Sequence, residues 1–258
     1  IPPGADPRYM GLKVTARDED MHQTLQGPQG RKIAYHQSTG TGPGLVFLGG
    51  FMSDMEGTKA IFLEEYATRT GRAFLRFDYS GHGASSEAFE DGCIGDWAED
   101  AQAAITQLTA GPQILVGSSL GGWLSLLMPQ RMPEKVAGLV TIAAAPDFTE
   151  DGMWAGFSED QRAAIMADGQ IKIPSDYDDP YTITRRLIED GRDHLVLRKP
   201  LSLSMPVRFL QGTHDTDVEM SVALRLLDHA QGPNIRLVAL KDADHRFSDG
   251  PCLGLIET

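Results

Sequence analysis

The stretch GPQILVGSSLGGWLSLL, residues 111–127, joins two apolar runs through a turn rich in glycine and serine. The run at residues 113–116 is short and rich in branched side chains, which indicates a buried strand, and the run that begins at residue 120 is long enough for a helix. The turn between them has the pattern G-x-S-x-G. At a strand-to-helix turn this pattern is typical of a nucleophile elbow, in which a serine has a strained backbone and its near neighbours are small.

Two adjacent serines occupy this turn, and the spacing of the glycines distinguishes them. Ser119 has Gly117 and Gly121 two residues away on either side, whereas Ser118 would have the bulky Val116 and Leu120. Ser119 is therefore the candidate nucleophile. The alternative is a glycine-rich connection that only packs a helix against a strand.

Strand and helix patterns alternate along the rest of the chain, which indicates a doubly wound α/β sheet. Six short apolar runs are typical of buried parallel strands, and they are residues 44–50, 72–79, 113–119, 136–144, 206–212 and 234–241. Residues 31–37 alternate polar and apolar side chains, as an exposed antiparallel strand does. Helices are predicted at residues 58–69, 94–110, 120–130 and 218–230.

One region interrupts the alternation and divides the chain into parts. Residues 147–199 contain no convincing strand pattern and carry scattered Met, Trp, Phe and Tyr side chains. We interpret them as a helical lid, inserted before the last two strands over the carboxyl edge of the sheet. Residues 11–146 and 200–258 then form the core, and residues 1–10 are expected to be flexible or tag-like.

Composition limits the classes of partner. The chain of 258 residues has 36 acidic and 23 basic side chains and a formal net charge of −13, which disfavours nucleic acid and anionic lipid. No apolar run reaches the roughly 18 residues of a membrane span. Cys93 and Cys252 are too few and too far apart for a disulfide framework or a zinc site. We expect a reducing compartment: the cytoplasm, or the mitochondrial matrix if the chain is a processed eukaryotic protein.

A serine nucleophile needs a histidine base and an acid, which should follow in that chain order after later strands. The segment that follows the strand at 206–212 offers Asp215 and Asp217, and the segment after the strand at 234–241 offers His245. Asp215 is favoured because it lies just past the turn at Gly212. Asp217 stands where a helix begins, and an acidic side chain there is expected simply to favour the helix N-terminus.

Acyl transfer also requires N–H donors for the oxyanion. The backbone N–H of Leu120, which follows the nucleophile, is one candidate. Gly49 and Gly50 allow a sharp turn that would present the N–H of Phe51, although an ordinary glycine turn is the alternative. His82 is more readily explained as part of a structural turn than as a chemical group. No metal or cofactor is required by this chemistry.

Several phrases in order resemble the α/β-hydrolase family of the mitochondrial mycophenolic acid acyl-glucuronide esterase, also described as a palmitoyl-protein thioesterase. The similarity runs from residue 44 to residue 247. It is carried by FMSDMEGTKA (51–60), FLRFDYSGHGAS (74–85), GPQILVGSSLGGWL (111–124), RMPEKV (131–136), IPSDY (173–177), PVRFLQGTHDTDV (206–218) and ADHRF (243–247). The family's usual His-Gly before the acid is Gln211-Gly212 here, and its Pro-Trp after residue 218 is Glu219-Met220.

The resemblance implies a serine hydrolase of esters or thioesters, with an α/β-hydrolase fold and Ser119, Asp215 and His245 at the positions of its triad. The substrate would be a small-molecule ester or an acylated protein. Apolar side chains of the acyl pocket are expected at Met52, Trp154, Phe157 and Met166, although such residues in a lid can equally be its packing. Alternatives are a triad hydrolase of another bond, such as an aminopeptidase or a C–C hydrolase, and a non-catalytic binding protein of the same fold.

Overall fold

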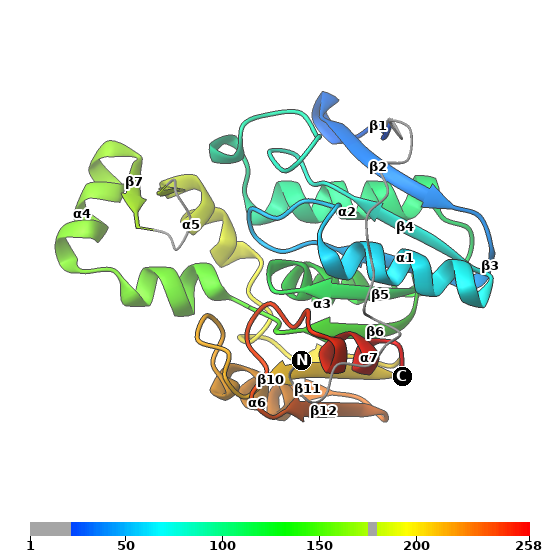
Figure 1. The fold of residues 1–258 in the computed structure, drawn as a ribbon. Coiled ribbons are helices and arrows are strands. Elements are labelled where there is room, and N and C mark those ends of the chain that lie inside the picture. Colours follow the sequence, from blue (N-terminus) through cyan, green and yellow to red (C-terminus); the bar gives the residue numbers. More distant parts are fainter. Residues whose placement is uncertain (1–21, 175–179) are drawn as a thin grey trace, which may run out of the picture.

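The structure is a computed structural model that describes residues 22–174 and 180–258; residues 1–10, predicted to be flexible or tag-like, lie outside these ranges. Eight strands form one sheet in the order β1-β2-β4-β3-β5-β6-β10-β12 (Figure 1). Their bounds are β1 (Gln23–Gln26), β2 (Lys32–Ser38), β3 (Thr41–Leu48), β4 (Arg72–Phe77), β5 (Gln113–Ser118), β6 (Val136–Ile142), β10 (Val207–Gly212) and β12 (Ile235–Leu240).

The directions of the strands confirm the predicted, mostly parallel sheet. Strands β4, β3, β5, β6, β10 and β12 run parallel, and β2 pairs antiparallel with both β1 and β4. The parallel strands inside the sheet are largely buried, because helices cover both faces, and this explains their nearly continuous apolar sequences, whereas the edge strand β12 is only partly buried. Strand β1 was not predicted, since its four residues, QTLQ, are mostly polar.

Helices cover both faces of the sheet (Figure 1). One face packs against α1 and α7, and the other packs against α2, α3 and α6. Their bounds are α1 (Thr58–Thr70), α2 (Ile94–Leu108), α3 (Leu120–Arg131), α6 (Met220–His229) and α7 (Gly250–Ile256), with 3₁₀ turns η2 (Pro28–Gly30), η3 (Phe89–Asp91) and η4 (Pro133–Lys135). Helix α7 was not predicted, because glycine and proline interrupt its short pattern, but the carboxylate of Asp249 caps its first turn by accepting the N–H of Cys252 at 2.8 Å.

The insert, residues 147–199, leaves the sheet after β6 and returns before β10. It contains the π-helical segment η5 (Thr149–Trp154), α4 (Glu159–Asp168), β7 (Gln170–Ile173), β8 (Tyr181–Thr184) and α5 (Arg185–Asp193), and a short parallel pair, β9 (Leu201–Ser202) with β11 (Ala230–Gln231), lies after it. Figure 1 shows the insert to one side of the sheet. The expectation that it lacks strands is wrong: β7 and β8 pair antiparallel, with Ile171 opposite the buried Ile183.

The two ends of the insert are joined by a buried carboxylate. Asp147, which is fully buried, accepts the backbone N–H of Val196 at 2.7 Å and that of Leu197 at 3.0 Å. The guanidinium of Arg198 lies 3.2 Å from the same carboxylate. The chain therefore leaves and re-enters the core at one point, which holds the insert beside the carboxyl edge of the sheet.

A second set of contacts ties the insert to the core helix α2. The carboxylate of Asp190 on α5 accepts the N–H of Gly95 at 2.7 Å, in the first turn of α2. The guanidinium of Arg186 on α5 lies 2.7 Å from Asp96.

Among the described residues, no helix combines the length and apolar character that a bilayer crossing requires.

Candidate active site

The predicted elbow has the backbone that its sequence requires. Ser119 lies between β5 and α3 with φ 53° and ψ −115°, a conformation that costs a non-glycine residue about 1–3 kcal/mol. A Cβ atom at Gly117 would lie 2.2 Å from the carbonyl oxygen of Gly121, and a Cβ at Gly121 would lie 2.1 Å from that of Leu48. The turn therefore tolerates only glycine at these positions, and the strained residue is Ser119 and not Ser118.

Two backbone N–H groups predicted to hold an oxyanion lie beside this serine. Leu120 begins α3, and Gly50 is close enough that a Cβ there would lie 3.5 Å from the Cβ of Ser119. Within the described residues, the amides of Phe51 and Leu120 donate no backbone hydrogen bond. Both are therefore free to donate to a bound group, and their role in an oxyanion hole stays a prediction.

The side chain of Phe51 anchors the loop that carries its amide. Its ring makes edge-to-face contacts with Phe89 at 4.9 Å, Phe148 at 5.5 Å and Trp97 at 6.1 Å between ring centroids. Such contacts add about 0.5–1.5 kcal/mol each beyond burial. The loop is thus fixed by packing between the core and the first residues of the insert.

The candidate base and acid meet across two loops. Nδ1 of His245 lies 2.9 Å from Oδ2 and 3.1 Å from Oδ1 of Asp215. Asp215 follows β10 and is buried, and His245 follows β12 and is partly exposed. Gly212 permits the approach of the two loops, because a Cβ there would lie 2.3 Å from the carbonyl oxygen of Ala243. Two residues that lie 30 positions apart in the sequence thus form one contact.

The carboxylate of Asp215 is held by three further donors. Its oxygens accept the backbone N–H of Asp217 at 3.0 Å, that of Val218 at 2.8 Å and the side-chain amide of Gln211 at 2.9 Å. Burial by itself raises the pKa of Asp215, but the hydrogen bonds from His245 and Val218 outweigh it, and the pKa is lowered. The carboxyl group is therefore ionised where it faces the imidazole.

Sequence reasoning noted Gln211 only as a departure from a family pattern and missed its role. Its amide also donates to the carbonyl oxygen of Val218 at 2.9 Å, so it bridges the acid and the end of the acid loop. The signal was a buried polar residue near the end of β10, a strand that is mostly apolar apart from Arg208. Only the tertiary structure shows that the side chain of Gln211 turns toward the carboxylate of Asp215.

Asp217, the alternative acid, differs from Asp215 in its contacts. Its backbone N–H donates to Asp215, and within the described residues it makes no ion pair with His245. Asp215, Asp217 and His245 could together offer ligand atoms to a metal ion. The oxygens of Asp215, however, already accept N–H groups from four residues, so the arrangement is that of a hydrogen-bonded acid and base.

An open cleft with a volume of about 180 Å³ brings Ser119 and His245 together. Phe51 lines the same cleft. Ser119 and His245 make no direct hydrogen bond in the described part of the chain, and hydrogen bonds between catalytic groups often tighten only when substrate binds. The cleft is therefore lined by the serine and by the histidine, and the buried carboxylate of Asp215 contacts the histidine.

The four residues predicted to bind the acyl group are not grouped around this cleft. Phe157 is buried in the core, and the ring of Trp154 lies under the guanidinium groups of Arg192 and Arg162, at 4.8 and 5.5 Å. Met52 is 47 % exposed and Met166 is 40 % exposed. Within the described residues none of the four lines the cleft, and their role stays a prediction.

His82 is enclosed by aromatic side chains. Its ring contacts Tyr79, Phe89 and Trp97 at centroid distances of 5.1–5.4 Å, and its Nδ1 lies 3.2 Å from the carbonyl oxygen of Ser80. Burial lowers the pKa of His82 to about 4, so the ring is neutral near pH 7. These contacts fit the interpretation of His82 as part of a structural turn.

The sequence of this chain is similar to a known family and to proteins that have been named. Residues 43–189 match the model of the alpha/beta hydrolase fold family. The chain is 35 % identical over 230 residues to the rat mitochondrial palmitoyl-protein thioesterase ABHD10, covering 87 % of this chain and 76 % of that protein. Identity to the human protein of the same name is 32 % over 249 residues, covering 96 % and 80 %.

Solved structures give the same result. A putative hydrolase from Agrobacterium vitis superposes with a TM-score of 0.87 at 36 % identity, over 92 % of this chain and 95 % of that one. Mouse alpha/beta hydrolase domain-containing protein 10 superposes with a TM-score of 0.84 at 32 % identity, over the same shares of the two chains. The resemblance stated from the sequence is therefore confirmed in both sequence and fold.

Proposed function

The chain belongs to the α/β-hydrolase family that includes the palmitoyl-protein thioesterase ABHD10, a family of ester and thioester hydrolases, and we propose that it acts through Ser119, His245 and Asp215. Its substrates would be carboxylic esters or thioesters, of the acyl-glucuronide or acyl-protein thioester type. The reaction would pass through an acyl-enzyme on Ser119.

Each group has a defined part in this mechanism. His245 takes the proton of the Ser119 hydroxyl as the oxygen attacks the carbonyl carbon, and it returns that proton to the leaving group. Asp215 keeps the imidazole in the required tautomer and stabilises the imidazolium. The amides of Phe51 and Leu120 donate to the oxyanion. Water, activated by His245, then hydrolyses the acyl-enzyme, releasing the acid and the free serine.

A single observation carries the proposal. One open cleft is lined by both a serine in a strained elbow and the histidine that is hydrogen-bonded to the buried Asp215 at 2.9 Å. A serine that only joined a strand to a helix would not require a strained backbone. A histidine with no function would not require a buried, ionised carboxylate as its partner. Their occurrence together favours nucleophilic catalysis over a binding role.

The compartment is part of the same proposal. Both cysteines, Cys93 and Cys252, are buried free thiols. Burial raises the pKa of each to about 12, which makes them poor nucleophiles. These thiols suit a reducing compartment, and the names of the mammalian relatives place those proteins in mitochondria.

Covalent labelling tests the nucleophile. The Ser119→Ala variant should lose fluorophosphonate labelling and about 10⁶-fold in kcat on p-nitrophenyl esters, because the attacking oxygen is gone. Labelling is read by mass spectrometry of the intact protein and hydrolysis by the release of nitrophenol.

Ser118→Ala is the matched control, because it removes the same atom from the adjacent residue. Ser118 lies at the end of β5 and also lines the cleft, so the control tests the strained backbone and not mere proximity. The Ser118→Ala variant should keep a substantial fraction of both the fluorophosphonate labelling and the ester hydrolysis. If Ser118→Ala were the inactive variant, the elbow would have been assigned to the wrong serine.

A further inference from the structure

Two basic side chains line the cleft that holds Ser119 and His245. Lys59 is the second residue of α1 and is half-buried, and Arg246 follows His245 and is exposed. They are 187 positions apart in the sequence, yet the ammonium of Lys59 donates to the carbonyl oxygen of Arg246 at 2.5 Å. A chain with a formal charge of −13 thus presents two positive groups beside its candidate nucleophile.

Among the described residues, neither Lys59 nor Arg246 forms a direct ion pair with a carboxylate. Asp244 acts on Lys59 electrostatically, but one of its oxygens accepts the backbone N–H of Phe247 at 3.2 Å. Asp54, the acidic side chain that lines the cleft, accepts the N–H of Glu56 at 2.9 Å. Both carboxylates keep their negative charge, but among the described residues neither is ion-paired with Lys59 or Arg246, so the two cations can still contact an anionic group directly.

The hydrogen-bonding capacity of Lys59 defines which ligand fits. An ammonium has three N–H donors, and one of them is used by the carbonyl oxygen of Arg246. Within the ranges that the structure describes, the other two donors remain available, which suits the two oxygens of a carboxylate. The N-terminal turn of α1 adds a positive electrostatic potential that favours an anion, since no acidic residue lies in this turn. Its N-cap residue, Gly57, has no side chain that could cap the helix, and it also lines the cleft.

We propose that Lys59 and Arg246 form a subsite for a carboxylate of the substrate, so that the preferred esters or thioesters carry an anionic group close to the scissile carbonyl. This inference rests on the proposed function, because it places the subsite in the same cleft as Ser119. It assigns a substrate class to that site through residues outside the triad and the oxyanion amides.

Pairs of charged and neutral esters with the same leaving group or the same acyl group test the subsite. One pair is mono-4-nitrophenyl adipate and 4-nitrophenyl hexanoate, in which the acyl group carries the charge. The other pair is 4-acetoxybenzoate and phenyl acetate, in which the leaving group carries it. For each pair the ratio of the two kcat/KM values is measured in wild type and in variants.

The Lys59→Gln variant should lower the charged-to-neutral ratio about tenfold in at least one pair, the loss expected for one charge-assisted hydrogen bond. The pair that responds identifies the half of the substrate that carries the anion. Lys59→Arg, which keeps the charge, should restore most of the ratio. Arg246→Gln should lower it by a smaller factor, because its side chain is exposed.

The same substitution at Lys32, an exposed position on β2, is the matched control and should leave both ratios unchanged. Ratios that are unaffected by Lys59→Gln and by Arg246→Gln would overturn the subsite while wild-type hydrolysis still supported the proposed function. If Lys59→Gln does not fold, Arg246→Gln decides the question. A wild-type protein that hydrolyses none of the four esters would contradict the proposed function itself.

Discussion

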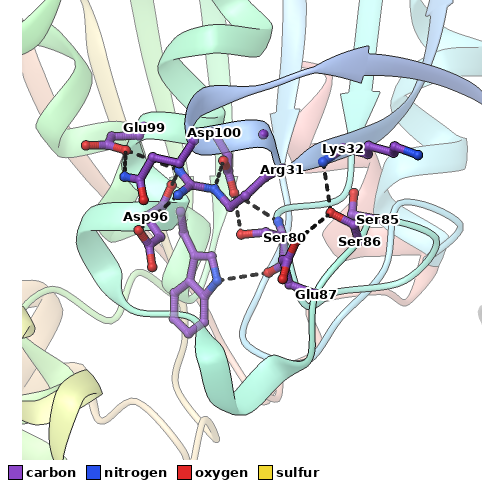
Figure 2. Close-up of polar contacts among 12 residues, drawn as sticks. Arg31, Lys32, Ser80, Ser85, Ser86, Glu87, Asp96, Glu99 and Asp100 are labelled. Atoms are coloured by element: carbon purple, nitrogen blue, oxygen red, sulfur yellow. Dashed lines mark hydrogen bonds and ion pairs between the residues drawn. The ribbon is translucent and has the colours of Figure 1, made fainter.

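Two groups of charged side chains in this molecule differ in how they are paired. Figure 2 shows Arg31 among three carboxylates, those of Asp96, Glu99 and Asp100, at 2.9–3.2 Å. Arg31 is 7 % exposed, and Asp100 also accepts both the N–H and the hydroxyl of Ser80. In the cleft, by contrast, Lys59 donates to a carbonyl oxygen and forms no ion pair among the described residues.

The difference separates charges that support the fold from charges that remain available to a ligand. In the Arg31 cluster, each charged group is paired with a residue from another segment of the chain. Arg31 precedes β2, Asp96 and Asp100 lie on α2, and Ser80 follows β4. The cluster thereby joins three separate elements of the core. A buried charge that loses its partners is costly, whereas a charge in an open cleft is still partly solvated and can exchange water for substrate.

Among the tests of this comparison, the largest effect is expected at Asp215, which is paired with His245 as closely as Arg31 is paired with its carboxylates. Asp215→Asn should lower kcat on the order of 10⁴-fold while the protein stays folded, because an amide cannot hold the imidazole in its required tautomer. Asp217→Asn is the matched variant and should retain nearly full activity. Kinetics with p-nitrophenyl esters and circular dichroism measure both.

The outcome separates the two acids. A folded Asp215→Asn enzyme within tenfold of wild type, beside an inactive Asp217→Asn enzyme, would move the acid to Asp217. Full activity in both would remove the triad assignment.

The Arg31 cluster should affect stability and not catalysis. Arg31→Met should lower the free energy of unfolding by about 3–5 kcal/mol, because three carboxylates then lose a buried partner. Arg185→Met breaks an exposed pair with Glu189, at 2.7 Å, and should cost less than about 1 kcal/mol. Urea unfolding followed by circular dichroism compares the two. Equal losses in the free energy of unfolding would mean that the buried Arg31 cluster stabilises the fold no more than an exposed ion pair does.

The smallest effect is a pH dependence of substrate preference. Burial lowers the pKa of Lys59 to about 8, with partial compensation from Asp244, and Arg246 and Cys252 also face its ammonium. Lys59 is charged below that pKa and neutral above it. The preference for a charged ester should therefore be full near pH 7 and fall about tenfold as the pH rises through 8 toward 9.5.

The measured quantity is the charged-to-neutral ratio of kcat/KM, so any pH dependence of the chemical steps that both esters share cancels. The thiol of Cys252 stays neutral in this range, because burial raises its pKa to about 12. The dependence should be absent in Lys59→Gln. A ratio that stays constant in wild type from pH 7 to 9.5 would show that Lys59 does not face the anion.

Much of the core and the order of the candidate site were predictable, because they depend on local rules. The apolar runs predicted the six parallel strands, and the predicted helices correspond to α1, α2, α3 and α6. The elbow could be located because Gly117 and Gly121 stand at the two positions where a side chain cannot fit. The strand pair β7 and β8 was missed, since four-residue strands with partly polar sequences have a weak pattern.

By itself, the sequence determined the parallel sheet, the strained turn at Ser119 and the order in which an acid and a histidine follow it. These features depend on side-chain size and period along a few consecutive residues. Only the tertiary structure decided which side chains meet: that Gln211 turns toward Asp215, and that Lys59 lies against Arg246. The physical reason is that a partner is chosen by long-range packing, and a charge in the sequence looks the same whether the fold neutralises it or leaves it open to a ligand.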